Sequence, residues 1–160
     1  MAALGFLAVR LVLAVVLFAH GAHTLFGAFA GPGIGPGGVD AATAHFATLG
    51  LQPAFPIAVA VGLAQFLGSL LIVIGWHARW AAGANAVVVL LTAWREQAPW
   101  GLFLNWTRAA DRGQGIEYSL VLGVVLVLIV LAGPGELSID ARRQRYVAAR
   151  AAGRARLRWT

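Results

Sequence analysis

Residues 115–140 read GIEYSLVLGVVLVLIVLAGPGELSID, and this stretch indicates the fold more directly than any other part of the chain. Within its apolar run, 116–132, the only polar residues are the three at positions 117–119. Such a run has roughly the length that a helix needs to cross a bilayer. Pro134, with a glycine on either side, cannot continue a helix and marks its end. The stretch therefore predicts a membrane-spanning helix with a carboxylate near its start.

The composition supports a membrane protein. The chain has 160 residues, 60% of them hydrophobic and only 11% charged, and its mean hydropathy is +0.80. These values are typical of integral membrane proteins. The sequence contains no cysteine, which excludes thiol redox catalysis, disulfides and thiolate metal sites.

Three further apolar runs precede this stretch, so the sequence predicts an all-α integral membrane four-helix bundle. Arg10 lies inside the first run, whereas a cleavable signal peptide carries its positive charge ahead of the apolar region, so we expect this run to be retained. The spans are expected at about 4–25, 55–76, 81–98 and 116–132, within a membrane domain of residues 1–141 followed by a basic tail, 142–160.

Two features are expected outside the spans. The glycine-rich segment 27–38 has no lysine and predicts a flexible connection, not a phosphate-binding loop. Asp40 is expected to cap a short helix that reaches about Leu49 and lies on the membrane surface. His45, on that helix, is interpreted as a polar surface residue.

The charge is uneven. The net charge is +6, and seven arginines follow Gly133, while residues 26–56 contain none. By the positive-inside rule both termini are expected in the cytoplasm. The segment from about Ile139 to Leu157 predicts a basic amphipathic helix on the inner membrane surface, with Tyr146 and Val147 facing lipid, and anionic lipid is a nearer partner than nucleic acid. The residues expected to bind lipid are Arg142, Arg143, Arg145 and Arg150.

Five polar residues are expected at depth in the membrane, where unpaired charges are costly and often functional. They are Arg10, His20, Gln65, Glu96 and Glu117. The four-span topology places His20, Glu96 and Glu117 at a similar height near the outer surface, so a hydrogen-bonded cluster of His20 and Glu117 is predicted. Arg10 is expected deeper, with Gln65, or a water-filled cavity leading to it, as its neighbour.

Simpler interpretations remain open for three of these positions. Arg10 has a side chain long enough to snorkel to the inner interface. Glu117 at a helix start is favoured by the helix dipole alone. His20 and His23 have a spacing compatible with metal binding, but no third ligand is evident in the sequence, so no metal site is predicted.

The order of several short motifs resembles the DoxX family of four-helix membrane proteins over about residues 4–141. The motifs are HG at 20–21, LFG at 25–27, F-x-x-L-G at 46–50, FLNW at 103–106, G-x-E-Y at 115–118 and GPG-x-x-S-x-D at 133–140. The resemblance adds Asn105 and Trp106 to the candidate pocket residues. It also shows two departures, because Thr24 and Gln65 stand where the family usually has lysine and glutamate.

The resemblance implies a small bacterial inner-membrane protein, and some relatives are associated with quinone-linked oxidoreductases. Our first hypothesis is therefore a subunit or accessory protein of such an enzyme or of a respiratory complex. It would carry a polar intramembrane pocket and no covalently bound cofactor, with a quinone as the implied ligand. The alternatives are a non-catalytic subunit that packs against a larger membrane complex or forms a homo-oligomer, and a small-molecule carrier. The sequence assigns no catalytic residue.

Overall fold

The computed structural model describes residues 2–31 and 34–156, and this part of the chain is all-helical apart from a single bridge between Gly31 and Gly35. The all-α prediction is confirmed. The α-helices are α1 (Ala2–Phe26), α2 (Val39–Thr48), α3 (Ala54–Ile74), α4 (Ala78–Thr92), α5 (Glu117–Ala132) and α6 (Ile139–Arg156). Helix α4 continues as a π-helical turn, η1 (Ala93–Gln97), and a 3₁₀ turn, η2 (Ala98–Trp100).

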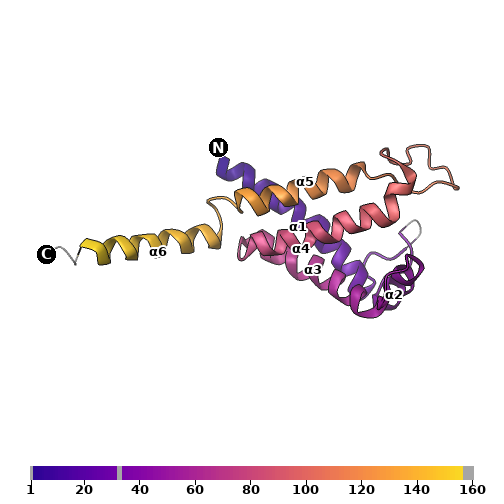
Figure 1. Cartoon of the computed structure of the whole chain (residues 1–160), viewed down its shortest axis with the longest axis horizontal. Coiled ribbons are helices and arrows are strands. Elements are labelled where there is room, and N and C mark those ends of the chain that lie inside the picture. Colours follow the sequence, from indigo (N-terminus) through magenta and orange to yellow (C-terminus); the bar gives the residue numbers. More distant parts are fainter. Residues whose placement is uncertain (1, 32–33, 157–160) are drawn as a thin grey trace.

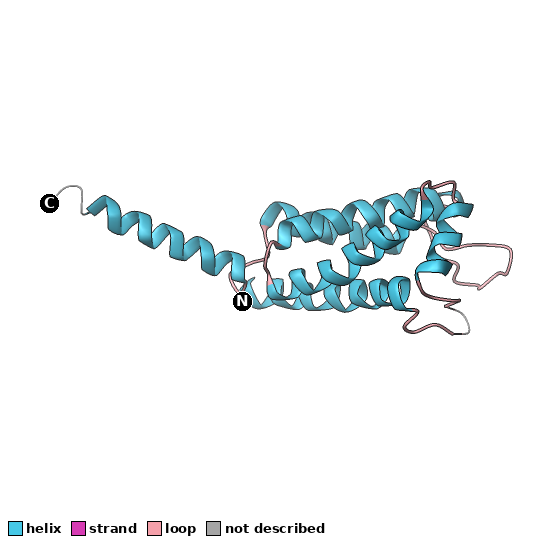
Figure 2. Ribbon diagram, turned by 90° about the horizontal axis from the view of Figure 1, so that it is seen from below, coloured by secondary structure: helices cyan, strands magenta, loops and turns pink. Residues whose placement is uncertain are grey.

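Helices α1, α3, α4 and α5 lie side by side, and α1 with α3, α3 with α4, and α4 with α5 are the contacting pairs (Figure 1). The long loops and α2 gather at one end of this group, and α6 leaves from the other (Figures 1 and 2). We call these the cavity end and the tail end. Helices α3 and α4 form a tight antiparallel hairpin, because α3 ends at Ile74 and α4 begins at Ala78.

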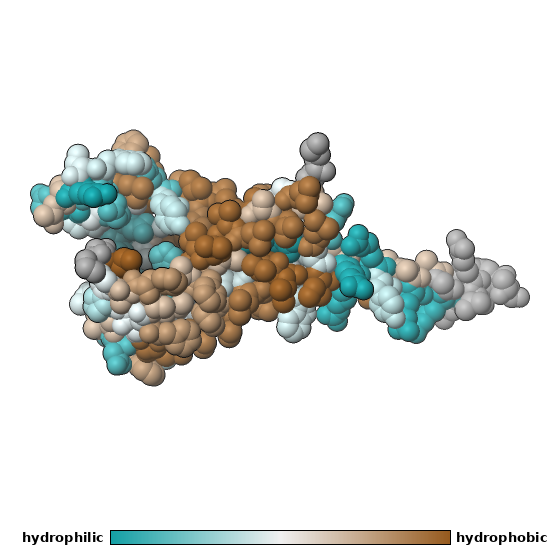
Figure 3. All heavy atoms as spheres, turned by 180° about the vertical axis from the view of Figure 1, so that it is seen from behind, coloured by the Kyte–Doolittle hydropathy of each residue, from teal (hydrophilic) through white to brown (hydrophobic). Residues whose placement is uncertain are grey.

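The membrane character of the chain is clear, although the four predicted spans differ in length. Two helical stretches, Ala3–Phe26 and Ala54–Ile74, are long and apolar enough to cross a membrane, and Glu117–Ala132 is a shorter apolar helix. On the face shown in the space-filling view, hydrophobic residues cover the middle of the molecule, with more hydrophilic residues towards both ends (Figure 3). A crossing by all four helices stays a prediction.

The core lies between these four helices. Its fully buried members include Leu17 of α1, Ile72 of α3 and Leu126 and Ile129 of α5. Glycine permits the closest approach of α1 to α3, because a Cβ atom at Gly21 would come within 2.7 Å of the Phe66 Cα atom. Small residues allow such backbone contact between membrane helices.

A buried polar side chain joins α3 to α4. Asn85 is fully buried, and its Nδ2 atom donates hydrogen bonds to the carbonyl oxygens of Ala64 (2.8 Å) and Ala81 (2.9 Å). Gly68 leaves the space that this amide fills, because a side chain there would collide with it. Interhelical bonds of this kind contribute about 1 kcal/mol in membrane proteins.

The tail end is held by the residues that come after the GPG turn. The Asp140 carboxylate accepts hydrogen bonds from the backbone N–H groups of His77 (3.0 Å) and Ala78 (3.1 Å), so it caps the start of α4. The Asp140 N–H donates to the Gly75 carbonyl (2.9 Å). The Ser138 hydroxyl accepts from the N–H of Ala141 (3.1 Å), in the first turn of α6. Ser138 and Asp140, at the end of the stretch 115–140, thus fasten one end of the helix group.

Helix α6 forms where the sequence predicts it, but its direction differs from the expectation. It extends away from the tail end roughly along the long axis of the molecule, instead of lying across that end (Figures 1 and 2). Tyr146 and Val147, expected to face lipid, are 58% and 59% exposed. Arg150 stacks over the Tyr146 ring at 5.1 Å from its centroid. Leu157, at the predicted end of this helix, lies outside the described residues.

The short helix in the first loop is also confirmed, with a different start. Helix α2 begins at Val39 after Gly38, and Asp40 lies in its first turn without a side-chain capping bond. The predicted Asp40 cap was therefore wrong. The helix packs against α3, so it covers the cavity end, and a location on the membrane surface stays a prediction.

Candidate functional site

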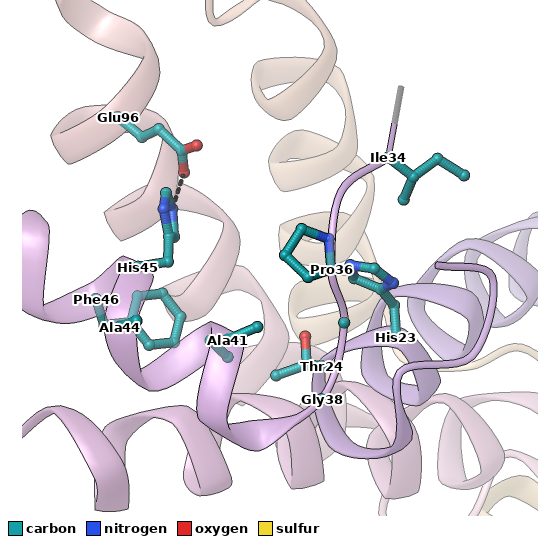
Figure 4. A pocket seen from close by; sticks show the side chains of 12 residues that line it. His23, Thr24, Ile34, Pro36, Gly38, Ala41, Ala44, His45, Phe46 and Glu96 are labelled. Carbon is teal, nitrogen blue, oxygen red and sulfur yellow. Dashed lines mark ion pairs between the residues drawn. The ribbon is translucent and has the colours of Figure 1, made fainter. Parts of the chain in front are cut away.

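Two adjoining cavities open at the cavity end, with volumes of about 490 and 600 Å³, and Figure 4 shows the smaller one. The residues that line both are His23, Thr24, Ile34, His45, Phe46 and Glu96. The larger cavity also reaches His20, Gln65, Thr92 and Gln97. We treat the two together and call them the histidine cavity. Three of the four histidines in the chain contribute to it.

A His–carboxylate pair stands at the wall of this cavity. The Nε2 atom of His45, on α2, lies 3.4 Å from the Oε2 atom of Glu96 (Figure 4). Both side chains are partly exposed, at 47% and 40%. Exposed pairs contribute little to stability, typically below about 1 kcal/mol. The pair therefore adds little to the stability of the fold, and both side chains remain partly accessible at the wall of the cavity.

His23 is oriented by the glycine-rich loop. Its Nδ1 atom lies 3.0 Å from the Ala28 carbonyl oxygen, and a carbonyl can only accept, so Nδ1 carries the hydrogen. In the neutral ring the Nε2 atom is then an acceptor. The His23 carbonyl accepts the N–H groups of Gly27 (3.0 Å) and Gly38 (2.8 Å), which hold the loop against the end of α1. The glycine-rich loop is therefore fastened at both of its ends.

The π-helical turn η1 carries the acidic residue of the cavity. Glu96 lies within this turn, as does Gln97, whose Oε1 atom is buried without a hydrogen-bond partner among the described residues. Single π turns inside α-helices often occur at functional sites. The unpaired acceptor of Gln97 is available to a ligand donor or to water.

Three of the predicted pocket residues come together here, namely His20, Gln65 and Glu96. Both positions that depart from the DoxX pattern, Thr24 and Gln65, line the same cavity. Three of the predicted pocket residues therefore line one cavity, and a binding role for this cavity stays a prediction.

Arg10 lies at the opposite end. It is fully buried, and its Nη2 atom donates to the Leu137 carbonyl beside Gly75, while Nε and Nη1 have no partner among the described residues. Because α1 and α3 are antiparallel, Arg10 stands level with Gly75 and far from Gln65, which lies near the level of Gly21. The expected Arg10–Gln65 proximity was wrong.

Glu117 does not line the cavity. The packing of Gly123 against Leu90 puts the start of α5 beside the end of α4, so Glu117 and Glu96 have similar heights. No hydrogen bond joins Glu117 to His20 among the described side chains, and the carboxylate that shares a cavity with His20 is Glu96. The predicted similarity of depth holds for these two carboxylates, but the wrong one was assigned to His20.

Asn105 organises the loop between η2 and α5. Its amide donates to the carbonyl oxygens of Ala109 (2.8 Å) and Arg112 (2.6 Å), and its Oδ1 atom accepts the Ala109 N–H (3.0 Å). Its polar atoms are therefore used by the loop itself. Trp106 is 77% exposed and lies outside the cavity. Neither residue belongs to the histidine cavity.

Within residues 2–31 and 34–156, no three His, Asp or Glu side chains are grouped as metal ligands would be. His45 is the main residue that sequence reasoning missed. It comes from a helix outside the predicted spans, and only the fold brings that helix against α3. One feature of the sequence could have indicated that His45 belongs to the site. It lies next to the aromatic Phe46 on a short helix that was expected close to the spans.

The fold and the cavity define a small helical membrane protein with a polar cavity at one end of its helices. The sequence model of the DoxX family matches residues 5–96, more than half of the chain, and the protein belongs to this family. The match includes His20, Gln65 and Glu96 and ends before Asn105, Trp106 and Glu117. No curated protein and no solved structure matches the chain.

Proposed function

We propose that this protein is a small inner-membrane subunit or accessory of a quinone-linked oxidoreductase, and that the histidine cavity binds the quinone ring. The convergence of three histidines, Gln65 and Glu96 on one cavity carries this proposal. A quinone presents two carbonyl acceptors on a flat apolar ring. The cavity offers N–H donors together with apolar walls from Ile34 and Phe46.

The protein residues would bind the ring and move protons. Reduction of a quinone takes two electrons and two protons, and the partner oxidoreductase would supply the electrons. The Gln65 amide and a histidine N–H would hold the two carbonyl oxygens. The His45–Glu96 pair, which is partly exposed to solvent, would pass protons between the ring and the bulk.

Substitution of two cavity residues should remove the bound quinone. We expect the His20→Phe, Gln65→Leu double variant to retain less than about a tenth of the quinone that the native protein retains, since each lost hydrogen bond costs about 1 kcal/mol or more. The measurement is solvent extraction and mass spectrometry of protein purified from native membranes. Glu117→Gln, outside the cavity, is the matched control and should retain quinone fully.

The alternative function has its own outcome in this experiment. A protein that co-purifies in fixed stoichiometry with a large membrane complex, and carries no quinone, would be the non-catalytic structural subunit. Equal quinone content in the native protein and the double variant would contradict the proposed site.

The proposed orientation puts both termini in the cytoplasm, so the histidine cavity opens to the opposite side. Residues 26–56 lack arginine, whereas the tail holds seven. Reporter fusions at the C-terminus and in the loop after Phe26 should report cytoplasm and periplasm, respectively. A C-terminal fusion that is active in the periplasm would reverse the assignment.

The tail is proposed to contact anionic lipid through its first arginines. Arg142 and Arg143 come soon after Asp140 and therefore remain near the tail end. Arg150 lies about 16 Å from Ile139 along the helix. Arg145 also stays near the tail end, because its Nη2 atom donates to the Glu136 carbonyl (3.2 Å). Because α6 points away from the bundle (Figure 1), Arg150 would reach headgroups only if the helix tilted.

A further inference from the structure

An apolar groove leads out of the histidine cavity along α1 and α3. It has a volume of about 430 Å³ and is lined by Leu11, Ala14, Val15, Phe18, Ala19, Phe29, Ser69, Leu70 and Val73. Ala19 and Phe29 line the histidine cavity as well, so the two spaces meet at these residues. We call it the α1–α3 groove. From Ala19 to Leu11 it runs along α1 for about 12 Å.

The groove presents no free polar group. Its one polar side chain is Ser69, which is 1% exposed and donates its hydroxyl hydrogen to the Phe66 carbonyl (2.6 Å) within the same helix. Small residues, Ala14 and Ala19, form part of its floor between larger neighbours. Such a surface accepts a hydrocarbon chain by shape and by van der Waals contact, and it offers nothing to a polar ligand.

A second groove of similar size provides an internal comparison. It lies between α1 and α5, has a volume of about 420 Å³ and is lined by apolar residues together with Tyr118. It shares no lining residue with the histidine cavity. Both grooves would face lipid, so an apolar surface alone does not distinguish them. They differ because only the α1–α3 groove adjoins the histidine cavity.

We propose that the ligand of the histidine cavity is an amphiphile whose hydrocarbon tail lies in the α1–α3 groove. This inference rests on the proposed function and narrows it to a long-chain, membrane-resident quinone that enters from the bilayer. The ring occupies the polar cavity, and the chain leaves past Phe29. The hydrocarbon chain of the quinone moves from lipid into the groove. The favourable binding free energy therefore comes from packing and orientation, not from the removal of apolar surface from water.

Photo-crosslinking in lipid nanodiscs tests where the tail lies. The probe is a benzoquinone whose decyl chain ends in a diazirine, and a benzoquinone with a methyl group in place of the chain competes for the ring site. We expect labels on residues 11–19 and 69–73, removed by excess competitor. Labels confined to Val121–Val125, in the groove between α1 and α5, or spread evenly over the lipid-facing surface, would overturn the tail assignment.

A second experiment compares substitutions at two valines of similar exposure, one in each groove. Val15 lines the α1–α3 groove and is 70% exposed, whereas Val12 lines the other groove and is 67% exposed. Val15→Trp should weaken binding of the decyl quinone by about tenfold, because the added ring fills the groove. Val12→Trp should leave it unchanged, and thermal unfolding of both variants checks that they fold.

The outcomes separate the two proposals. If both quinones bind and neither tryptophan changes the affinity, the tail groove is wrong and the ring site stands. If neither quinone binds above the level of empty nanodiscs, the proposed function fails together with this inference.

Discussion

Replacement of Gly75 by alanine should strongly destabilise the protein. Gly75 comes directly after α3 with φ +67°, and a Cβ atom there would come within 3.0 Å of the Ser138 Cα atom and overlap the Arg10 guanidinium. The left-handed backbone costs roughly 1–2 kcal/mol for alanine, and overpacking costs roughly 1–3 kcal/mol more. We therefore expect a loss of about 2–5 kcal/mol, measured by unfolding in nanodiscs.

Gly50→Ala is the control that measures the cost of the left-handed backbone conformation alone. Gly50 has φ +73°, close to that of Gly75, but its added Cβ would meet only the Arg95 Nη2 atom at an ordinary 3.5 Å. We expect it to lose about 1–2 kcal/mol, the backbone cost alone. Equal losses at the two positions would show that the contact of Arg10 and Ser138 with Gly75 is not tight, and that this packing at the tail end is incorrect.

The second large effect is expected at the two positions that depart from the DoxX pattern. Thr24→Lys and Gln65→Glu each place one unpaired charge in the same cavity, and we expect each to cost roughly 2–3 kcal/mol in a membrane protein. The double variant should recover part of the summed loss, because the new charges offset each other. Thermodynamic cycles in nanodiscs measure this coupling, expected at roughly 1–3 kcal/mol.

Thr48→Lys, combined with Gln65→Glu, is the control in which the new lysine lies outside the cavity. Thr48 is exposed on α2 and lines neither part of the histidine cavity. Combined with Gln65→Glu, it should show additive effects, within about 0.5 kcal/mol. Additivity in the Thr24–Gln65 pair as well would mean that these side chains do not face each other, and would weaken the site.

Hydropathy and turn chemistry were sufficient to predict most of the fold. The apolar runs and the stop at Pro134 predicted α1, α3 and α5 to within a few residues, because long apolar helices and Gly-Pro ends are local signals. For α4, the apolar run began later than the helix does, since its first turn holds Arg79 and Trp80. The cap supplied by Asp140 comes from a remote segment and leaves no mark in the local sequence.

The candidate site was harder to predict than the fold. A sequence indicates how deep a residue lies along a membrane helix, but it does not indicate how the helix is rotated about its axis. Topology predicted similar heights for Glu96 and Glu117, and their helices do lie side by side. Helix α5 is apolar around its whole circumference, so its sequence does not say which side faces the bundle. His45 was missed for a related reason, since the return of α2 towards α3 depends on tertiary packing alone.

The π turn that carries Glu96 also suggests how such a site can arise in evolution. A π turn is an α-helix with one additional residue, so one inserted codon is enough to create it. Deletion of Trp94, within the π turn, would restore a regular helix. The residues after the deletion would then be rotated about the helix axis by about 100°. Glu96 would then leave the wall of the cavity while α4 stayed in place. Lineages with and without this insertion would share the helices and differ in their chemistry.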